Sequence, residues 1–62
     1  MKNVELKQEG TILTVKIDLS KTFGPSASGK TIIIASTEGN VKAGRDADGG
    51  DAIMGLNVYK KP

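Results

Sequence analysis

Hydrophobic and polar residues alternate along much of this chain, and a period of two is typical of β-strands with one buried face. The clearest case is the segment 11–20, TILTVKIDLS, in which four large apolar residues occupy every second position. These residues are Leu13, Val15, Ile17 and Leu19. The segment therefore predicts a half-buried strand.

A second strand is predicted immediately upstream, where Val4 and Leu6 alternate with charged residues. A two-residue turn at Glu9-Gly10 sets Leu6 opposite Leu13 in this interpretation, and Val4 opposite Val15. All four apolar side chains then share one face, and a slip of one residue would destroy the match. We expect an N-terminal β-hairpin with its turn at Glu9-Gly10.

The rest of the chain shows the same character. Residues 30–37, KTIIIAST, are dense in β-branched side chains, which favour strands. Glu38 to Asn40 reads as a turn, Val41 to Ala43 as a short return strand, and Gly44 to Asp51 as a polar glycine-rich loop. Residues 53–60, IMGLNVYK, alternate again and predict a last strand.

No segment predicts a helix, because the best stretch, residues 41–52, is interrupted by glycine and aspartate. We therefore expect an all-β fold of four to five mostly antiparallel strands, forming a small antiparallel sheet or a partly open barrel. Residues 1–62 are expected to form a single small β-rich domain, since a chain of this length supports one modest core.

Residues 24–31, GPSASGKT, match the phosphate-binding pattern G-x-x-x-x-G-K-[ST]. A true phosphate-binding loop leads into a helix whose N-terminus faces the anion. Here Ile32 to Ile34 follow, a poor opening for a helix and a good one for a strand. We interpret Gly24–Thr31 as a loop between strands, and a nucleotide triphosphatase is not expected.

A weaker function for the same loop remains open. Consecutive backbone amides can form a small anion-binding nest, and a neighbouring lysine would add positive charge. The candidate anion-binding residues are Ser26, Ser28, Gly29 and Lys30.

The acidic loop DADGGD resembles the start of a calcium-binding loop. That pattern requires glycine at position six and a bidentate glutamate at position twelve. Counted from Asp46, these positions hold Asp51 and Asn57, so we expect a solvated turn and no metal site.

Catalysis is not expected either. The chain has no histidine and no cysteine, which removes the commonest general base and the thiol nucleophile. A Ser–Lys arrangement of Lys30 with Ser26 or Ser28 would require a desolvated lysine, and a polar loop does not supply that environment. We predict a protein that is not an enzyme and uses no cofactor.

Nine basic and seven acidic residues give a net charge of +2, a mild preference for anionic partners. Small β domains bind single-stranded nucleic acid through basic faces that carry exposed aromatic rings. The candidate nucleic-acid-binding residues are Lys7, Lys16, Lys30, Lys42, Arg45, Tyr59, Lys60 and Lys61. The alternative is that the lysines keep strand edges soluble and unpaired.

Self-association is the rival expectation. Ile12, Ile33, Ile53 and Tyr59 fall on the faces opposite the main apolar sets of their strands. An outer apolar patch of this kind is often covered by another subunit, so we expect a homodimer or higher oligomer. A homo-oligomeric assembly protein without a nucleic-acid role is thus the alternative function.

The first ten residues lack the apolar core of a signal peptide, and the longest apolar run, Ile32 to Ala35, is too short to span a bilayer. These features predict a cytoplasmic protein with no membrane partner.

Overall fold

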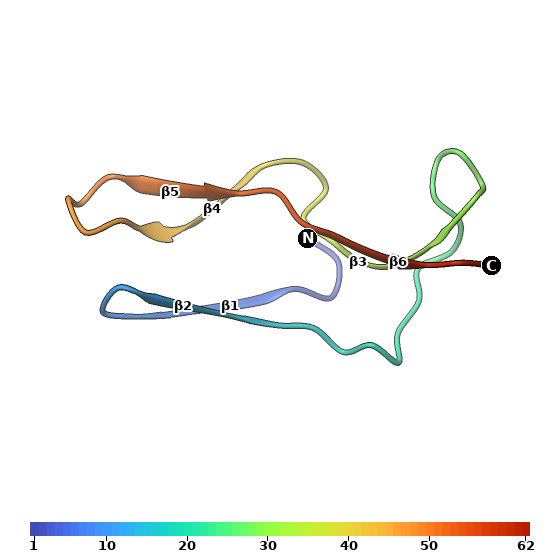
Figure 1. Cartoon of the computed structure of the whole chain (residues 1–62), viewed down its shortest axis with the longest axis horizontal. Helices are drawn as coiled ribbons and strands as arrows, with labels where there is room; N and C mark the ends of the chain where they lie inside the picture. The colour runs from blue at the N-terminus through green and yellow to red at the C-terminus, as the bar shows by residue number, and fades with distance from the viewer.

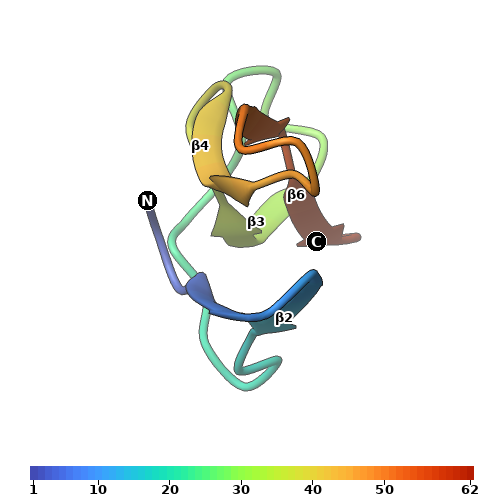
Figure 2. The same cartoon turned by 90° about the vertical axis from the view of Figure 1, so that its left-hand side faces the viewer.

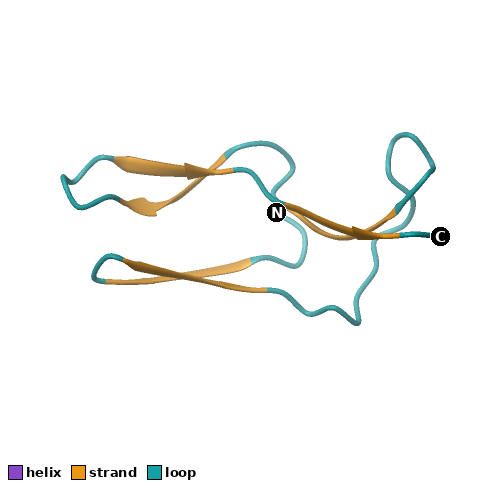
Figure 3. Ribbon diagram, viewed as in Figure 1, coloured by secondary structure: helices purple, strands orange, loops and turns teal.

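The structure is a computed structural model that describes all 62 residues as six short strands joined by loops, with no helix (Figures 1 and 3). The strands are β1 (Glu5–Glu9), β2 (Ile12–Lys16), β3 (Ile32–Ser36), β4 (Val41–Arg45), β5 (Asp51–Met54) and β6 (Asn57–Lys60). All pairings are antiparallel, which confirms the all-β class. The expected single sheet or barrel of four to five strands is not confirmed, because the strands form three two-stranded sheets: β1–β2, β3–β6 and β4–β5.

The N-terminal hairpin forms as expected, but its predicted turn is wrong. The turn residues are Gly10-Thr11, and Leu6 pairs with Val15 while Gln8 pairs with Leu13. Gly10 has a φ of +58°, which places the one residue that adopts this conformation without strain at the first central position, as in a type II′ turn. Each β1 residue pairs with a β2 residue two positions further along the chain than predicted, so the same side chains still share the apolar face.

The sheets β3–β6 and β4–β5 are two parts of one bent ribbon, which runs the length of the molecule in Figure 1. They meet where Thr37 and Leu56 continue the pairing: the Thr37 N–H donates to the Leu56 carbonyl at 3.0 Å, and the Leu56 N–H donates to Thr37 Oγ1 at 3.0 Å. The ribbon bends there because Glu38-Gly39 both have positive φ, at 57° and 106°.

The same bend divides the strand predicted for residues 53–60 into β5 and β6. Between them lies Gly55, where an added Cβ would stand 2.6 Å from Asn40 Oδ1. Any other residue at Gly55 would therefore have to push the Asn40 side chain aside.

Gln8 ties the N-terminal hairpin to the ribbon. Its side-chain amide donates from Nε2 to the Arg45 carbonyl at 2.7 Å, and its Oε1 accepts from the Arg45 N–H at 2.9 Å. The side chain thus acts as a one-residue strand partner for the edge of β4. A Cβ on Gly44 would overlap Gln8 Oε1, so any larger residue there would push the Gln8 side chain out of this contact.

Asn3 fixes the other end of the hairpin. Its Nδ2 donates to the carbonyls of Asp18 at 2.8 Å and Ile34 at 3.0 Å, and its Oδ1 accepts from the Asp18 N–H at 3.3 Å. The segment before β1, the segment after β2 and the central strand β3 are therefore joined by one side chain.

The buried core is very small. Four residues are buried, and all lie in β3 or directly after it: Ile34, Ala35, Ser36 and Thr37. The molecule is elongated, with extents of 41 × 20 × 14 Å, and Figure 2 shows the β1–β2 hairpin as a layer separate from β4–β5. Leu13 and Val15, expected to be core residues, remain 39% and 36% exposed.

None of the chain forms a helix with the length and apolar character needed to cross a bilayer.

Candidate functional site

Four of the nine basic residues are matched by nearby carboxylates. Four lysines form ion pairs with nitrogen–oxygen distances of 2.9–3.9 Å: Lys2–Glu38, Lys7–Glu9, Lys16–Glu5 and Lys42–Asp51. These pairs are exposed and contribute little to stability, but they locally cancel the charge that an anionic partner would meet. The positive charges of three predicted nucleic-acid-binding residues are therefore balanced by neighbouring carboxylates. These residues are Lys7, Lys16 and Lys42.

Three of the five basic residues without an ion pair lie at the opposite end of the molecule, around β3, β6 and the Gly24–Thr31 loop. Residues 24–36 and 57–62 contain Lys30, Lys60 and Lys61 and no Asp or Glu. The remaining residues carry six of the nine basic groups and all seven acidic ones. The net charge of +2 thus combines a basic end of +3 with a remainder of −1.

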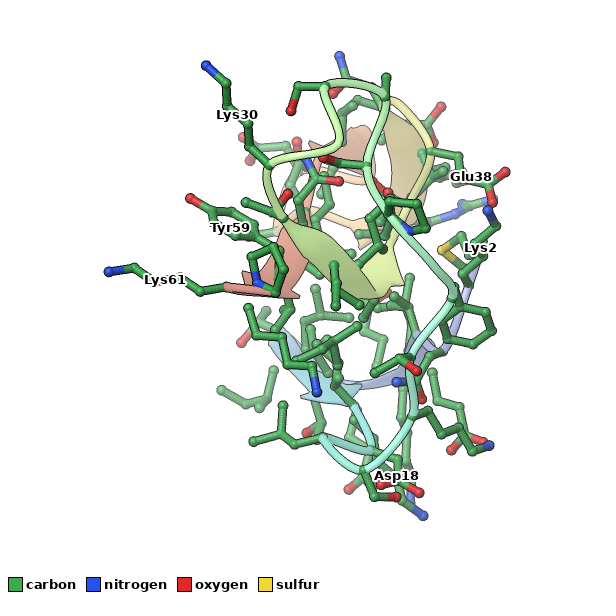
Figure 4. All side chains as sticks on the ribbon, turned by 90° about the vertical axis from the view of Figure 1, so that its right-hand side faces the viewer. Lys2, Asp18, Lys30, Glu38, Tyr59 and Lys61 are labelled. Atoms are coloured by element: carbon green, nitrogen blue, oxygen red, sulfur yellow. The ribbon has the colours of Figure 1, made fainter.

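Tyr59 lies within this basic end and is 63% exposed. It pairs with Ile33 across the β3–β6 sheet, so an aromatic ring and a half-buried isoleucine stand side by side on one face. Figure 4 shows Lys30, Tyr59 and Lys61 projecting from the same side of the molecule, away from Lys2 and Glu38. Lys60 follows Tyr59 in β6 and points to the other face.

We call Lys30, Ile33, Tyr59 and Lys61 the Tyr59 face. The sequence identified three of its members but spread the candidate site over both ends of the chain. Arg45 lies at the far end of β4 beside the acidic loop that begins at Asp46. Ion pairing within the hairpin would have removed Lys7 and Lys16 from the candidate site. Glu9 lies two residues after Lys7 on the same strand face, and the hairpin register sets Glu5 opposite Lys16.

The Gly24–Thr31 loop is a tight turn between extended segments. The Ser26 N–H donates to the Thr31 carbonyl at 2.8 Å, and the Gly29 N–H donates to the Ser26 carbonyl at 2.9 Å. The chain then enters β3, so the helix that a phosphate-binding loop needs is replaced by a strand.

These bonds also bear on the predicted anion nest. The amides of Ser26 and Gly29 are already used within the loop, and the hydroxyls of Ser26 and Ser28 lie 3.2 Å apart. Thr31 Oγ1 donates to the Ser26 hydroxyl at 2.9 Å. The Lys30 side chain extends away from the loop (Figure 4).

The acidic loop is organised around its own aspartate. Asp46 Oδ1 accepts from the N–H groups of Asp48 at 2.8 Å and Gly50 at 2.9 Å. Gly49 has a φ of +84°, so Ala47 to Gly49 form the three-residue hairpin loop that commonly ends in a left-handed glycine. The structure has no group of three or more acidic, histidine or cysteine side chains arranged to hold a metal.

The surface has one recess, of about 360 Å³, near the base of the N-terminal hairpin. It is lined by Asn3, Val4, Glu5, Lys16, Asp18 and Lys21. Its walls carry two carboxylates and two ammonium groups, so it offers no single charge to a ligand.

Asp18 in this recess accepts hydrogen bonds at Oδ1 from the Ser20 hydroxyl at 2.6 Å and the Ser20 N–H at 2.9 Å. These bonds, first the hydroxyl and then the N–H, hold the pKa of Asp18 below its ordinary value of 3.8, and the charges of Lys21 and Lys16 act in the same direction. The carboxylate serves as a local turn cap.

Comparison with protein-family models, with curated proteins and with solved structures gives no match to this chain.

Proposed function

We propose that this protein binds single-stranded nucleic acid through the Tyr59 face. The observation that carries the proposal is the combination at one end of the molecule: a 63% exposed tyrosine, lysines on the same side, and no acidic residue in the surrounding segments. A stacking ring beside unpaired positive charge is the chemistry with which proteins hold single strands irrespective of sequence.

Each member of the face has a distinct role in this proposal. A base stacks on the Tyr59 ring, and Ile33 extends the apolar surface beneath it because the two residues are paired across the sheet. Lys30 and Lys61 contact the phosphates on either side of the stacked base. Lys60, on the other face, adds to the attraction without touching that base.

Binding is measured by the fluorescence anisotropy of a labelled oligothymidylate of about ten nucleotides at low salt. We expect saturable binding that weakens as salt rises, with a slope of log K against log salt near −2, because about three lysines release counterions from a single strand. A flat titration at the lowest salt concentration contradicts the proposal.

Two substitutions at Tyr59 separate stacking from charge. Tyr59→Ala is expected to weaken binding about 5- to 150-fold, the range that corresponds to ~1–3 kcal/mol for one stacked base. Tyr59→Phe keeps the ring and is expected to bind nearly as well as the wild type. Equal affinities for the alanine variant and the wild type would exclude Tyr59 from the site.

Lys61→Gln and Lys7→Gln form a matched pair of charge variants. Each removes one positive charge, but Lys7 already has Glu9 at 2.9 Å and lies in the N-terminal hairpin. Lys61→Gln is expected to reduce the magnitude of the salt slope by about 0.7, and Lys7→Gln to leave it almost unchanged. Equal effects would show attraction to the net charge of the whole chain and not to this face.

Inorganic phosphate separates this function from simple anion binding at the Gly24–Thr31 loop. If the loop held phosphate, millimolar phosphate would displace the oligonucleotide more strongly than chloride at the same ionic strength. We expect the two salts to act alike.

A further inference from the structure

The β2 strand has a free edge and an apolar face that the chain itself leaves uncovered. Its sequence, ILTVK, has one charged residue at its end, and all five residues are exposed. Leu13 and Val15 point to the apolar side of the hairpin and are still 39% and 36% exposed. We propose that a second copy of this chain covers this edge, forming a two-fold symmetric dimer in which β2 pairs antiparallel with β2 of the partner.

The exposed surface of the chain is too large for a compact monomer of its size. A folded monomer of 6.5 kDa is expected to expose about 3,800 Å². This chain exposes 4572 Å². The difference, roughly 750 Å², is close to the ~800 Å² that each partner buries in a protein–protein interface of standard size.

Every other long edge is protected. In β1, ELKQE, three of the five residues are charged, and charges discourage edge pairing. The second edge of β3 is partly paired through Lys2 with Ser36 and Pro25 with Ile32. The edge of β4 is covered at Arg45 by the Gln8 side chain.

The two remaining strands are shorter and offer less edge. β5 and β6 have four residues each, against five in β2. Only β2 presents five residues without a guarding charge in its middle, a proline, or a covering segment. Such edges are templates for pairing with another chain.

The register of the hairpin defines which groups are free. Ile12 closes the two-residue turn opposite Glu9, so the hydrogen-bonding positions toward β1 are Ile12, Thr14 and Lys16. The N–H and C=O groups of Leu13 and Val15 then point away from β1. Pairing two β2 strands about Thr14 overlaps all five residues and sets Leu13 against Val15 of the partner subunit.

The dimer built in this way has a continuous four-stranded sheet, β1–β2 followed by β2–β1 of the partner. Leu13 and Val15 from both copies meet on one face of it and bury each other's exposed area. The Tyr59 face lies on other strands, so this inference is independent of nucleic-acid binding.

Analytical ultracentrifugation over a wide concentration range tests the oligomeric state. We expect the wild type to reach twice the 6.5 kDa chain mass. Leu13→Lys places a charge at the proposed interface and is expected to sediment as a monomer. Ile53→Lys makes the same change at a 62% exposed position in β5 and is expected to leave the dimer intact.

Three results overturn the proposal: a wild-type monomer at every concentration, a dimer that survives Leu13→Lys, or a dimer broken by Ile53→Lys. Amide hydrogen exchange of the wild type covers the case in which Leu13→Lys does not fold. The amides of Leu13 and Val15 are expected to be protected and to lose protection on dilution, while the edge amide of Leu6 exchanges quickly at both concentrations. Equally fast exchange at all three positions refutes the β2 interface.

Discussion

At the scale of single residues, side-chain amides and carboxylates replace a hydrophobic core in joining the parts of this chain. Asn3 connects three segments, Gln8 connects two, and Asp46 and Asp18 each cap a turn. These roles could not be predicted from the sequence, because a polar residue in a strand is ordinarily interpreted as solvent-exposed. Their partners are backbone groups whose positions depend on the whole fold.

The hydrogen bond from Ser20 to Asp18 can be tested by measuring the pKa of Asp18. Replacing Ser20 with alanine removes the hydroxyl that contributes most to lowering the pKa of Asp18, so that pKa is expected to rise toward 3.8. An NMR titration of the Asp18 carboxyl carbon measures it in both proteins. A pKa that is the same in the variant and the wild type would show that the Ser20 bond does not stabilise the carboxylate.

The lowered pKa of Asp18 also makes the stability of the fold depend on pH. A carboxylate with a lowered pKa in the folded state stabilises the fold above its unfolded pKa, and this contribution is lost as pH falls through the folded pKa. The wild type and Ser20→Ala are therefore expected to differ in stability at neutral pH and to converge as the pH falls below the lowered pKa of Asp18 in the folded wild type.

At the scale of elements, the strands that are visible in the sequence are those with strong alternation or β-branching. Residues 32–36 form β3 and not a helix, which removes the helix that the match to a phosphate-binding loop would need. The hairpin turn was misplaced by one residue, because alternation fixes which side chains share a face but not which two residues form the turn. The division of residues 53–60 into two strands was also missed, since it depends on the bend that the positive φ angles of Glu38 and Gly39 produce in the paired segment.

The contact between Gln8 and β4 can be tested by a substitution at Gly44. Gly44→Ala puts a methyl group into the space of Gln8 Oε1 and is expected to break both bonds to Arg45, at a cost of about 1–3 kcal/mol in the free energy of unfolding. Chemical denaturation measures the loss.

The double variant provides the control. In a Gln8→Ala background no side chain remains to be displaced, so Gly44→Ala is expected to cost only a few tenths of a kcal/mol. If the loss of stability in the double variant equals the sum of the losses in the two single variants, Gly44 and Gln8 do not interact and the proposed contact is wrong.

At the scale of the whole molecule, the chain is an elongated set of ribbons with very little interior and an uneven distribution of charge. Ile12, Ile53 and Tyr59 are exposed as expected, but they lie in three different sheets, so the four outer apolar residues do not form one patch. Only Ile33 and Tyr59 are neighbours. Composition predicted a mildly basic protein, and the fold concentrates that charge around β3 and β6.

The separation of the three lysines from the acidic residues could not be predicted from the sequence, because it depends on which strands pair. Lys30 and Lys61 are 31 positions apart along the chain and project from the same side only because β3 pairs with β6. Five of the seven carboxylates lie in the two hairpins, in β1 and from Asp46 to Asp51.

Tyr59 can itself report whether a base stacks on its ring, since the chain has one tyrosine and no tryptophan. Its intrinsic fluorescence is recorded while unlabelled oligothymidylate is added at low salt, and then as salt is raised. We predict that the emission is quenched in step with binding, because the ring stacks on a base, and that it recovers as salt releases the strand. If anisotropy shows that the oligonucleotide is bound while the tyrosine emission stays unchanged, Tyr59 does not stack on a base and the proposed site is wrong.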